Sequence, residues 1–243
     1  MNKLLGYIFT PVHYIAFGLA LIIFHPIQWF CLKLGGYKAH KHSVDILNFF
    51  LESTYYLVAS RIKFTDDQSL PTDRPIIFIA NHQSMYDIPP LIWHLRKYHA
   101  KFISKIELTK GIPSISFNLK HGGGANIDRK DSKQAIAEIL GLAKRMNESN
   151  WSTVIFPEGT RSKDGQLKPF AVGGIATLLK KVPQALIVPV AINGSWKLTR
   201  FGMFPLSFGE KMTWTVLTPL EPKGIPVEEV VAIAEETIRK ALS

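Results

Sequence analysis

The sequence is poor in cysteine and in acidic residues. Cys31 is the only cysteine among 243 residues, which excludes a disulfide within the chain. It lies in an apolar stretch without metal-ligating neighbours at a useful spacing, so we expect a small, buried apolar side chain. Hydrophobic residues are not scarce: they make up 47% of the chain, which excludes a disordered protein and suits one sizeable domain with an appendage.

The shortage of acidic residues leaves a net charge of +10, from 29 Lys and Arg against 19 Asp and Glu. Residues 92–145 alone hold 11 basic and 4 acidic side chains. Such an excess is compatible with a nucleic acid, with an anionic membrane surface or with a solvated basic face. No recognised nucleic-acid-binding motif accompanies the charge, and we expect no nucleic-acid partner.

Charged residues are also absent between Lys3 and Lys33, over 29 residues. This length can cross a bilayer, but the uninterrupted apolar part, Tyr14 to Phe24, has only 11 residues. A signal peptide is disfavoured because no small-residue cleavage site follows cleanly. We expect helices that dip into one leaflet, with a single membrane span and a buried core helix as alternatives.

The chain is expected to have two parts. Residues 1–60 form an apolar, helical, membrane-anchoring segment with a helix start at Ser43, and residues 61–243 form an α/β domain. In that domain, helices are predicted over residues 131–147, 173–181 and 226–242, the first with a capping box of Asp131 and Gln134. Strands are predicted over residues 61–65, 75–81, 100–105, 125–128, 152–158, 185–192 and 213–220.

This alternation of strands and helices predicts an α/β fold with a mainly parallel, mixed sheet flanked by helices. In such sheets, binding sites form at the carboxyl ends of the strands. Two polar stretches follow predicted strands in this way, "NHQSMYD" (residues 81–87) and "EGTR" (residues 158–161). We therefore expect both stretches at the same site.

His82 and Asp87 in the first stretch can form an acid–base pair. A neutral imidazole accepts a proton near physiological pH, and a carboxylate on its other ring nitrogen fixes the tautomer and stabilises the charged form. A helix that begins near Ser84 would bring position 87 back toward position 82. The alternative is a capping loop in which Asp87 binds backbone amides, and the spacing alone does not decide between the two.

The second stretch belongs to "FPEGTRS", residues 156–162. Gly159 allows a substrate to approach the backbone, and Arg161 offers a planar fork of donors suited to a phosphate. Glu158 can accept hydrogen bonds from hydroxyl groups. The alternative is a turn closed by a local Glu–Arg ion pair.

A third stretch, "HGGGANIDRKD" (residues 121–131), places three glycines before a predicted strand and Arg129 after it. The glycines allow close approach of a substrate, although the stretch matches neither a P-loop nor a dinucleotide fingerprint, and a flexible loop is the alternative. Lys105 ends another predicted strand and can also meet an anion.

A base, an anion clamp, a basic face and an apolar N-terminus together indicate a phosphorylated lipid as substrate, with one of its hydroxyl groups as the nucleophile. The chain has no Gly-x-Ser-x-Gly motif, and "NGSW" at residues 193–196 does not supply one. We therefore expect no acyl-enzyme on a serine.

With these motifs in this order, the chain resembles the 1-acylglycerol-3-phosphate acyltransferases over residues 75–219. "NHQSMYD", "GGGANIDR", "FPEGTRS" and "IVPVAI" (residues 187–192) are similar to the first to fourth motifs of that family. Two departures stand out: Ala125 and Asn126 occupy positions where many members have an aromatic residue, and Val172 replaces a lysine, for which the nearby Lys168 could substitute.

The resemblance implies a role for each candidate residue. His82 would be the general base and Asp87 its orienting partner. Glu158, Gly159 and Arg161 would bind the acyl acceptor, with Arg161 on its phosphate and Arg129 as a second phosphate contact. Pro189 would shape the acyl or acceptor pocket. Thr160, within the same motif, and Lys105, at its strand end, are further substrate-binding candidates.

The family's activity is transfer of an acyl chain from acyl-CoA or acyl–acyl carrier protein to the sn-2 hydroxyl of 1-acylglycerol 3-phosphate. The product would be phosphatidic acid for phospholipid synthesis. The thioester is then a co-substrate, with no cofactor or metal expected, and the setting is an anionic membrane surface on the cytoplasmic face of the inner membrane. Another acceptor is the main alternative: glycerol 3-phosphate, a lysophospholipid or a lyso-amino-acid lipid. A second alternative is a protein that binds the membrane surface but catalyses no reaction.

Overall fold

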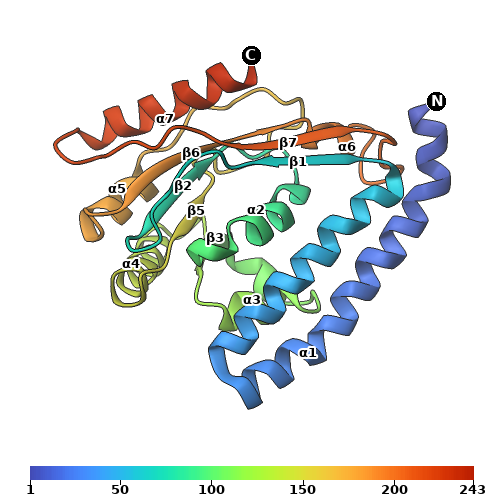
Figure 1. Ribbon diagram of the computed structural model, residues 1–243, viewed down its shortest axis with the longest axis horizontal. Coiled ribbons are helices and arrows are strands. Elements are labelled where there is room, and N and C mark those ends of the chain that lie inside the picture. Colours follow the sequence, from blue (N-terminus) through green and yellow to red (C-terminus); the bar gives the residue numbers. More distant parts are fainter.

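The N-terminal segment is a helical hairpin. In the computed structural model, which describes residues 1–243, α1 (Asn2–Ser53) reverses direction at Gly36 and its two limbs lie side by side (Figure 1). Gly36 has a φ of 67°, a left-handed conformation that favours glycine and interrupts the helix. The predicted helix start at Ser43 is therefore wrong, because the second limb begins directly after this glycine.

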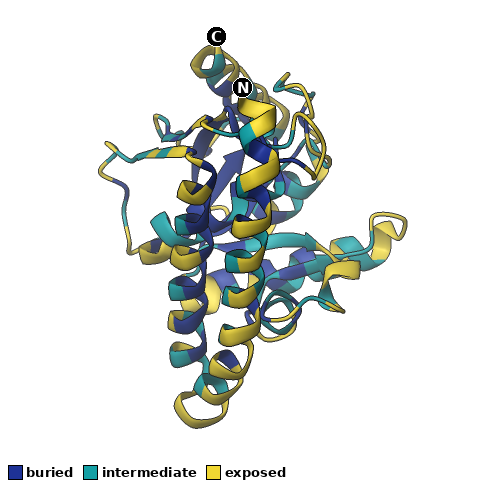
Figure 2. Cartoon of the chain, turned by 90° about the vertical axis from the view of Figure 1, so that its right-hand side faces the viewer, coloured by how far each residue is buried: buried dark blue, intermediate teal, exposed yellow.

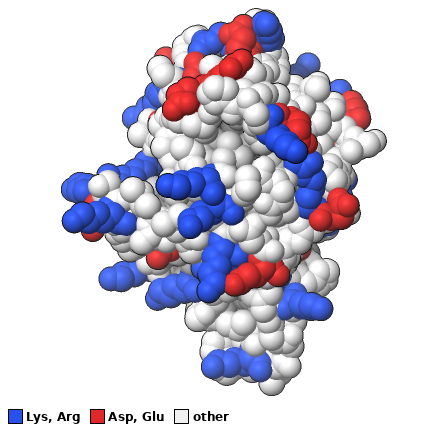
Figure 3. Space-filling model, turned by 90° about the vertical axis from the view of Figure 1, so that its left-hand side faces the viewer, with Lys and Arg blue, Asp and Glu red and all other residues white.

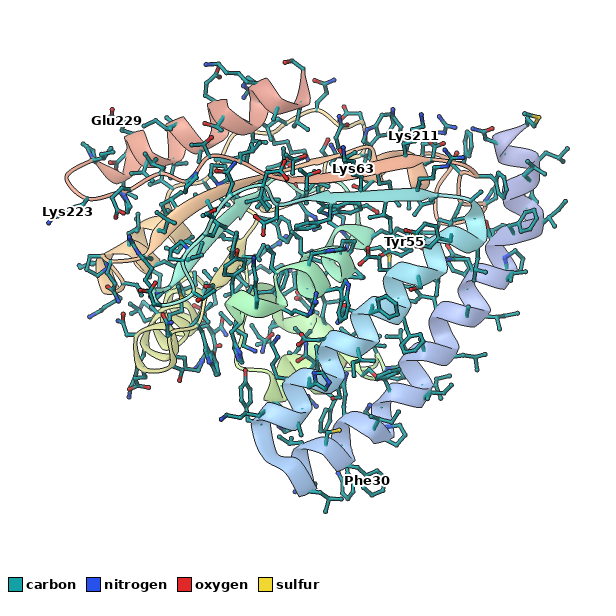
Figure 4. All side chains as sticks on the ribbon, in the orientation of Figure 1. Phe30, Tyr55, Lys63, Lys211, Lys223 and Glu229 are labelled. Carbon is teal, nitrogen blue, oxygen red and sulfur yellow. The ribbon has the colours of Figure 1, made fainter.

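Many residues of the hairpin are exposed (Figure 2), and some of these exposed residues form an apolar stripe. Residues three and four apart share one side of a helix, and the exposed residues of the first limb follow that spacing: Leu4, Ile8, Val12, Ile15, Leu19 and Ile22. Phe30, near the tip of the hairpin, points away from the protein (Figure 4). A buried core helix is thus excluded, and the stripe fits membrane association. Cys31, which we expected to be buried, is only half-buried because it lies on this exposed limb.

Both ends of α1 pack against the α/β domain. Near the first end, the Thr10 hydroxyl accepts a hydrogen bond from the Leu206 backbone amide at 2.9 Å. At the other end, the short helix η1 (Thr54–Val58) leads into the sheet and buries Tyr55 beneath it (Figure 4). The hairpin therefore leaves the domain and returns to it, so both ends of α1 are held by the same domain.

A seven-stranded sheet forms the centre of the domain, in the order β1-β7-β6-β2-β5-β3-β4. Only β6 and β7 pair antiparallel, so the predicted mainly parallel, mixed sheet is confirmed. All five residues of the central strand β2 are buried, which is why its sequence is an unbroken apolar run. The strands span Arg61–Thr65 (β1), Ile76–Ala80 (β2), Lys101–Lys105 (β3), Ala125–Ile127 (β4), Thr153–Ile155 (β5), Leu186–Asn193 (β6) and Lys211–Val216 (β7).

Helices cover both faces of the sheet (Figure 1). Ile77 and Ile79 of β2 pack in one core with α4, α5 and α7, whereas Ile76 and Phe78 pack in a second core with α2 and η1. Alternate residues of a strand point to opposite faces, so one short strand supplies both cores. The helices span Ile88–His94 (α2), Ile115–His121 (α3), Ser132–Ser149 (α4), Gly173–Lys181 (α5), Ser195–Leu198 (α6) and Val227–Leu242 (α7), and the short helices Met85–Asp87 (η2), Arg96–Tyr98 (η3) and Ile106–Thr109 (η4).

The start of α4 differs in one detail from the capping box that the sequence predicts. Asp131 caps the helix by accepting hydrogen bonds from the Lys133 and Gln134 amides, both at 3.0 Å. The Gln134 side chain does not return to the cap. It bonds instead to the Asp128 amide and the Asn126 carbonyl, which fixes the loop after β4.

Lys101 is a buried charge at the start of β3. Its residue is 8% exposed, and its ammonium lies 5.1 Å from the Tyr37 ring and 4.8 Å from the Trp151 ring. Burial, with a smaller contribution from nearby Lys41, lowers the pKa of Lys101 to about 7. The folded protein therefore holds this proton far less tightly than the unfolded chain does.

Replacing Lys101 with Met should flatten the pH dependence of stability. In the parent, the unfolded state keeps the lysine proton up to the ordinary pKa of 10.5, so the free energy of unfolding should rise with pH between about 7 and 10.5. Lys101→Met lacks this titration, and its advantage in Tm should be largest near pH 6 and shrink by pH 9.5. Melting both proteins in detergent across this range tests the point, and a pH-independent difference in Tm would contradict it.

Candidate active site

The loop after β2 is anchored to the neighbouring strand by Asn81. The Asn81 side chain donates to the Ile192 carbonyl at 2.8 Å and accepts from the Ile192 amide at 2.7 Å. This pair of bonds joins the carboxyl ends of β2 and β6. It fixes the point at which the chain leaves the sheet, directly before His82.

His82 and Asp87 do form a pair, with 2.8 Å between Nδ1 and Oδ2. Ser84 caps η2, and the resulting turn brings the Asp87 carboxylate back so that Oδ2 also accepts from the Gln83 and Ser84 amides at 2.7 and 2.9 Å. The acid–base pair and the capping loop, which the sequence leaves as alternatives, are therefore both present. The same carboxylate oxygen serves both roles.

The surroundings of His82 leave its other ring nitrogen available. Asp87 is fully buried, and its Oδ2 already accepts from two backbone amides, so Nδ1 of a neutral His82 ring donates to it and Nε2 keeps a lone pair. Nε2 has no hydrogen-bond partner within the protein, and the ring stacks on Phe156 with 4.2 Å between ring centroids. His82 is thus oriented to accept a proton at Nε2.

Glu158 links the loop after β2 to the loop after β5 through hydrogen bonds. One carboxylate oxygen accepts from the His82 amide at 2.7 Å and the other from the Lys168 amide at 3.2 Å. The Ser162 amide adds a bond to the His82 carbonyl at 2.7 Å. Burial raises the pKa of Glu158, although these amide bonds oppose the shift. The predicted contact of Glu158 with an acceptor hydroxyl remains a prediction.

The rest of this loop is braced by Lys168. Its ammonium donates to the Thr160 hydroxyl at 3.0 Å and to the Arg161 carbonyl at 2.8 Å. Gly159 has a φ of 68°, and open space lies where a Cβ would be, so a side chain here would be strained but not blocked. The loop therefore presents an open backbone surface, with the exposed Arg161 side chain at its end.

Arg129 and Arg161 come close to one another at the same edge of the sheet. Partial burial lowers the pKa of Arg129, Glu107 opposes the shift, and the charge of Arg161 adds to it. Lys105 is exposed at the end of β3, where its register partner is Ile127, two residues before Arg129. Arg129 and Arg161 thus lie near one another, Lys105 ends the neighbouring strand, and none of the three is paired with an acidic side chain.

One sequence-based expectation is not met. The glycines before β4 serve packing, because a Cβ on Gly123 would lie 2.6 Å from the Trp151 ring and one on Gly124 would lie 2.7 Å from the Phe102 carbonyl oxygen. Pro189 is buried in the middle of β6, opposite Ile79, and its part in shaping the acyl or acceptor pocket stays a prediction. Asn81 and Phe156 have roles at the site that no local pattern predicts, because their contacts with β6 and with His82 join distant parts of the chain.

Comparison with known proteins places this geometry in a family. A family model described as Acyltransferase matches residues 61–193. The chain is 29% identical over 206 residues to the human 1-acyl-sn-glycerol-3-phosphate acyltransferase beta, covering 84% of this chain and 71% of the human protein. It is 34% identical over 137 residues to a chloroplastic 1-acyl-sn-glycerol-3-phosphate acyltransferase of Brassica napus, covering 56% of this chain but only 38% of the plant protein.

A solved structure shares the whole fold. The crystal structure of the 1-acyl-sn-glycerophosphate (LPA) acyltransferase PlsC from Thermotoga maritima superposes with a TM-score of 0.78 at 23% sequence identity, covering 99% of this chain and 96% of that one. The likeness includes the helical hairpin as well as the sheet, since almost the entire chain is covered. Because the family model matches the chain from β1 to β6, including both loops of the site, the chain belongs to the acyltransferase family.

Proposed function

We propose that the protein transfers an acyl chain from acyl-CoA or acyl–acyl carrier protein to the sn-2 hydroxyl of 1-acylglycerol 3-phosphate, forming phosphatidic acid. The observation that carries the proposal is the His82–Asp87 pair, with Nε2 of His82 free of protein partners and the His82 carbonyl bonded to the loop that holds Arg161. The names of the relatives agree with this acceptor. The thioester is a co-substrate, and the reaction needs no further cofactor.

The chemistry follows from the protonation state of His82. Nε2 removes the proton of the sn-2 hydroxyl as its oxygen attacks the thioester carbonyl, giving a tetrahedral oxyanion and an imidazolium. Asp87 stabilises the imidazolium through Nδ1. Collapse of the oxyanion breaks the carbon–sulfur bond, and His82 returns its proton to the departing sulfur. One ester forms, one thioester breaks, and the histidine ends as it began.

The cations account for the acceptor's phosphate. Arg161 extends from a braced loop, and Arg129 and Lys105 reach the same edge of the sheet from β4 and β3. A phosphate monoester would relieve the repulsion between the two guanidinium groups by accepting from both. Gly159 and Thr160 would then contact the glycerol backbone.

The hairpin places the reaction at a lipid surface. Its apolar stripe would enter one leaflet, and basic side chains would meet anionic head groups. Lys and Arg gather across the middle of the side shown in Figure 3, with Asp and Glu mostly toward its upper end. Because soluble acyl-CoA and acyl carrier protein supply the donor, we place the enzyme on the cytoplasmic face of the inner membrane.

Product analysis tests the reaction directly. The purified protein in detergent, supplied with oleoyl-CoA and lysophosphatidic acid, should yield phosphatidic acid by mass spectrometry. Replacing the donor with oleoyl–acyl carrier protein identifies the natural thioester. Product from glycerol 3-phosphate or a lysophospholipid, with none from lysophosphatidic acid under either donor, would overturn the proposed acceptor.

Arg161→Lys should weaken acceptor binding, because lysine keeps the charge but loses the planar fork that binds two phosphate oxygens at once. We expect KM for lysophosphatidic acid to rise by roughly tenfold, as loss of about 1.4 kcal/mol would give, with KM for the acyl donor unchanged. Steady-state kinetics in mixed micelles provide the measurement.

Arg74→Lys is the matched control. Arg74 uses the same fork on Glu221, at 2.9 Å for both bonds, on the exposed far end of the sheet. This variant should leave both KM values unchanged. An unchanged acceptor KM in Arg161→Lys as well would remove Arg161 from the phosphate site.

A further inference from the structure

The turn "NGSW" (Asn193–Trp196) lies at the same sheet edge as His82. It follows β6 directly, and β6 is the neighbour of β2 in the sheet. Gly194 has a φ of 83°, and a Cβ at this position would collide with the Lys211 carbonyl, so the turn packs tightly against β7. Ser195 begins α6 and is fully buried. The turn after β6 therefore holds the buried Ser195 hydroxyl at the sheet edge that carries the acid–base pair.

The Ser195 hydroxyl donates to Oδ1 of Asp87 at 2.5 Å. The two oxygens of Asp87 thus have separate tasks. Oδ2 accepts from Nδ1 of His82 and from the backbone amides of Gln83 and Ser84. Oδ1 has Ser195 as its hydrogen-bond partner, and the other acceptor within reach of that hydroxyl, Oε1 of Gln83, is farther away at 3.4 Å.

We propose that Ser195 is a positioning residue for acyl transfer, which acts by holding the Asp87 carboxylate in the orientation that serves His82. The inference rests on the proposed function of the His82–Asp87 pair and extends it by one residue. Ser195 does not touch the reacting atoms. Its hydroxyl donates a hydrogen bond to Asp87. Nothing in the turn resembles the strained strand-to-helix elbow that exposes a nucleophilic serine.

Two physical effects follow from this bond. First, it fixes the rotation of the carboxylate, so that Oδ2 stays aligned with Nδ1 of His82 while the ring changes its charge. Second, a donor on Oδ1 draws negative charge away from Oδ2 and moderates the pull of Asp87 on the imidazolium. Without Ser195, Oδ2 would remain anchored by the Gln83 and Ser84 amides but would carry more of the negative charge, so it would hold the His82 proton more strongly, while Oδ1 would be free to move.

Ser195→Ala tests both effects in the full-length protein with lysophosphatidic acid and oleoyl-CoA. We expect kcat and kcat/KM to fall together by about tenfold, since misplaced catalytic groups lose rate rather than substrate binding. The acid limb of the kcat/KM profile should move to higher pH, because His82 keeps its proton longer. Ser195→Cys retains a weak donor and should fall between the parent and Ser195→Ala on both measures.

Ser207→Ala is the matched control. Ser207 is also fully buried and also donates to a carboxylate, Oε1 of Glu210 at 2.6 Å, but it lies in the loop before β7. This variant loses a buried hydroxyl–carboxylate bond of the same kind. Its Tm should fall, while its kcat and its pH profile should match those of the parent.

The outcomes separate this inference from the proposed function. If the parent makes phosphatidic acid and both Ser195 variants show parental kcat and pH profile, Ser195 is only structural and the inference fails while the function stands. A fall in kcat in Ser195→Ala without any shift of the acid limb, matched by Ser207→Ala, would likewise overturn it.

A readout without turnover covers the case in which the parent makes no product. NMR of labelled histidine side chains, with the His82 signal assigned by its loss in His82→Ala, follows the ring through a pH titration. The titration of His82 should move to higher pH in Ser195→Ala and stay in place in Ser207→Ala. Coincident His82 titrations in all three proteins would overturn the inference, whatever the substrate is.

Discussion

His82→Ala should remove phosphatidic acid formation while leaving the protein folded. General acid–base catalysis contributes about 10²–10⁴-fold, and alanine supplies neither the base that activates the hydroxyl nor the acid that protonates the leaving thiol. The ring is partly exposed and its backbone bonds to Glu158 and Ser162 remain, so Tm should change little. Initial rates with oleoyl-CoA and lysophosphatidic acid, read by mass spectrometry, give the answer.

The chain contains a well-matched control for this variant. His94 also pairs with a carboxylate, Oε1 of Glu52 at 3.0 Å, and also stacks on a phenylalanine, Phe64, with 4.4 Å between ring centroids. It lies at the end of α2, away from both loops of the site. His94→Ala should keep its turnover. Parental rates in His82→Ala would contradict the general-base mechanism. Equal losses of rate in His82→Ala and His94→Ala would point to a shared structural cause.

Glu158→Gln should be nearly as damaging, although Glu158 need not touch the substrate. Its two oxygens accept from backbone amides of different loops, one at His82 and one at Lys168. A glutamine keeps one acceptor oxygen but turns an NH₂ group toward the other amide, so one bond becomes a contact between two donors. Because a displacement of about 1 Å in a catalytic group can cost roughly 10²-fold, we expect kcat/KM to fall by about that factor.

Glu158 should also set a lower pH limit to activity. Burial raises the pKa of Glu158, so the carboxylate takes up a proton at a higher pH than an exposed glutamate does. Below that pKa, one oxygen becomes a donor and the link between the loops weakens. Activity should therefore be lost on acidification in the parent, while the residual activity of Glu158→Gln should lack this component.

Glu235→Gln serves as the control for this variant. Glu235 lies on α7 and accepts from the Phe170 amide at 2.9 Å, so it bridges helix and loop by the same kind of bond outside the site. The change should affect Tm but not kcat/KM. If Glu158→Gln retains parental kinetics, the link between the loops is not needed for turnover.

The parts of the structure that follow from local chemistry could be predicted from sequence. β2 reads as a buried strand because all five of its residues are apolar, and the turn that joins His82 to Asp87 depends on a serine cap three residues before the aspartate. Both features are encoded within a few residues. The position of both loops after predicted parallel strands then indicated that they meet, and the bonds of Glu158 confirm it.

The parts that were missed depend on contacts between distant residues. Ser195 meets Asp87 only because β6 and β2 are neighbours in the sheet, and no local pattern marks that serine. The glycines before β4 suggested room for a substrate, yet the space next to Gly123 is filled by Trp151, a residue from a different segment of the chain. Sequence thus shows which residues are capable of chemistry, whereas the sheet order decides which of them act together.

The contacts between the hairpin and the domain have a consequence for the order in which the parts of the chain fold during synthesis. The Thr10 and His13 side chains bond to Leu206 and Tyr86, and β1 is completed at the sheet edge by β7, which begins at Lys211. A ribosome therefore releases the apolar hairpin long before the segments that cover its polar inner side exist. The nascent hairpin would reach the lipid surface first, and the catalytic domain would then assemble beside it, already at the place where its substrates are found.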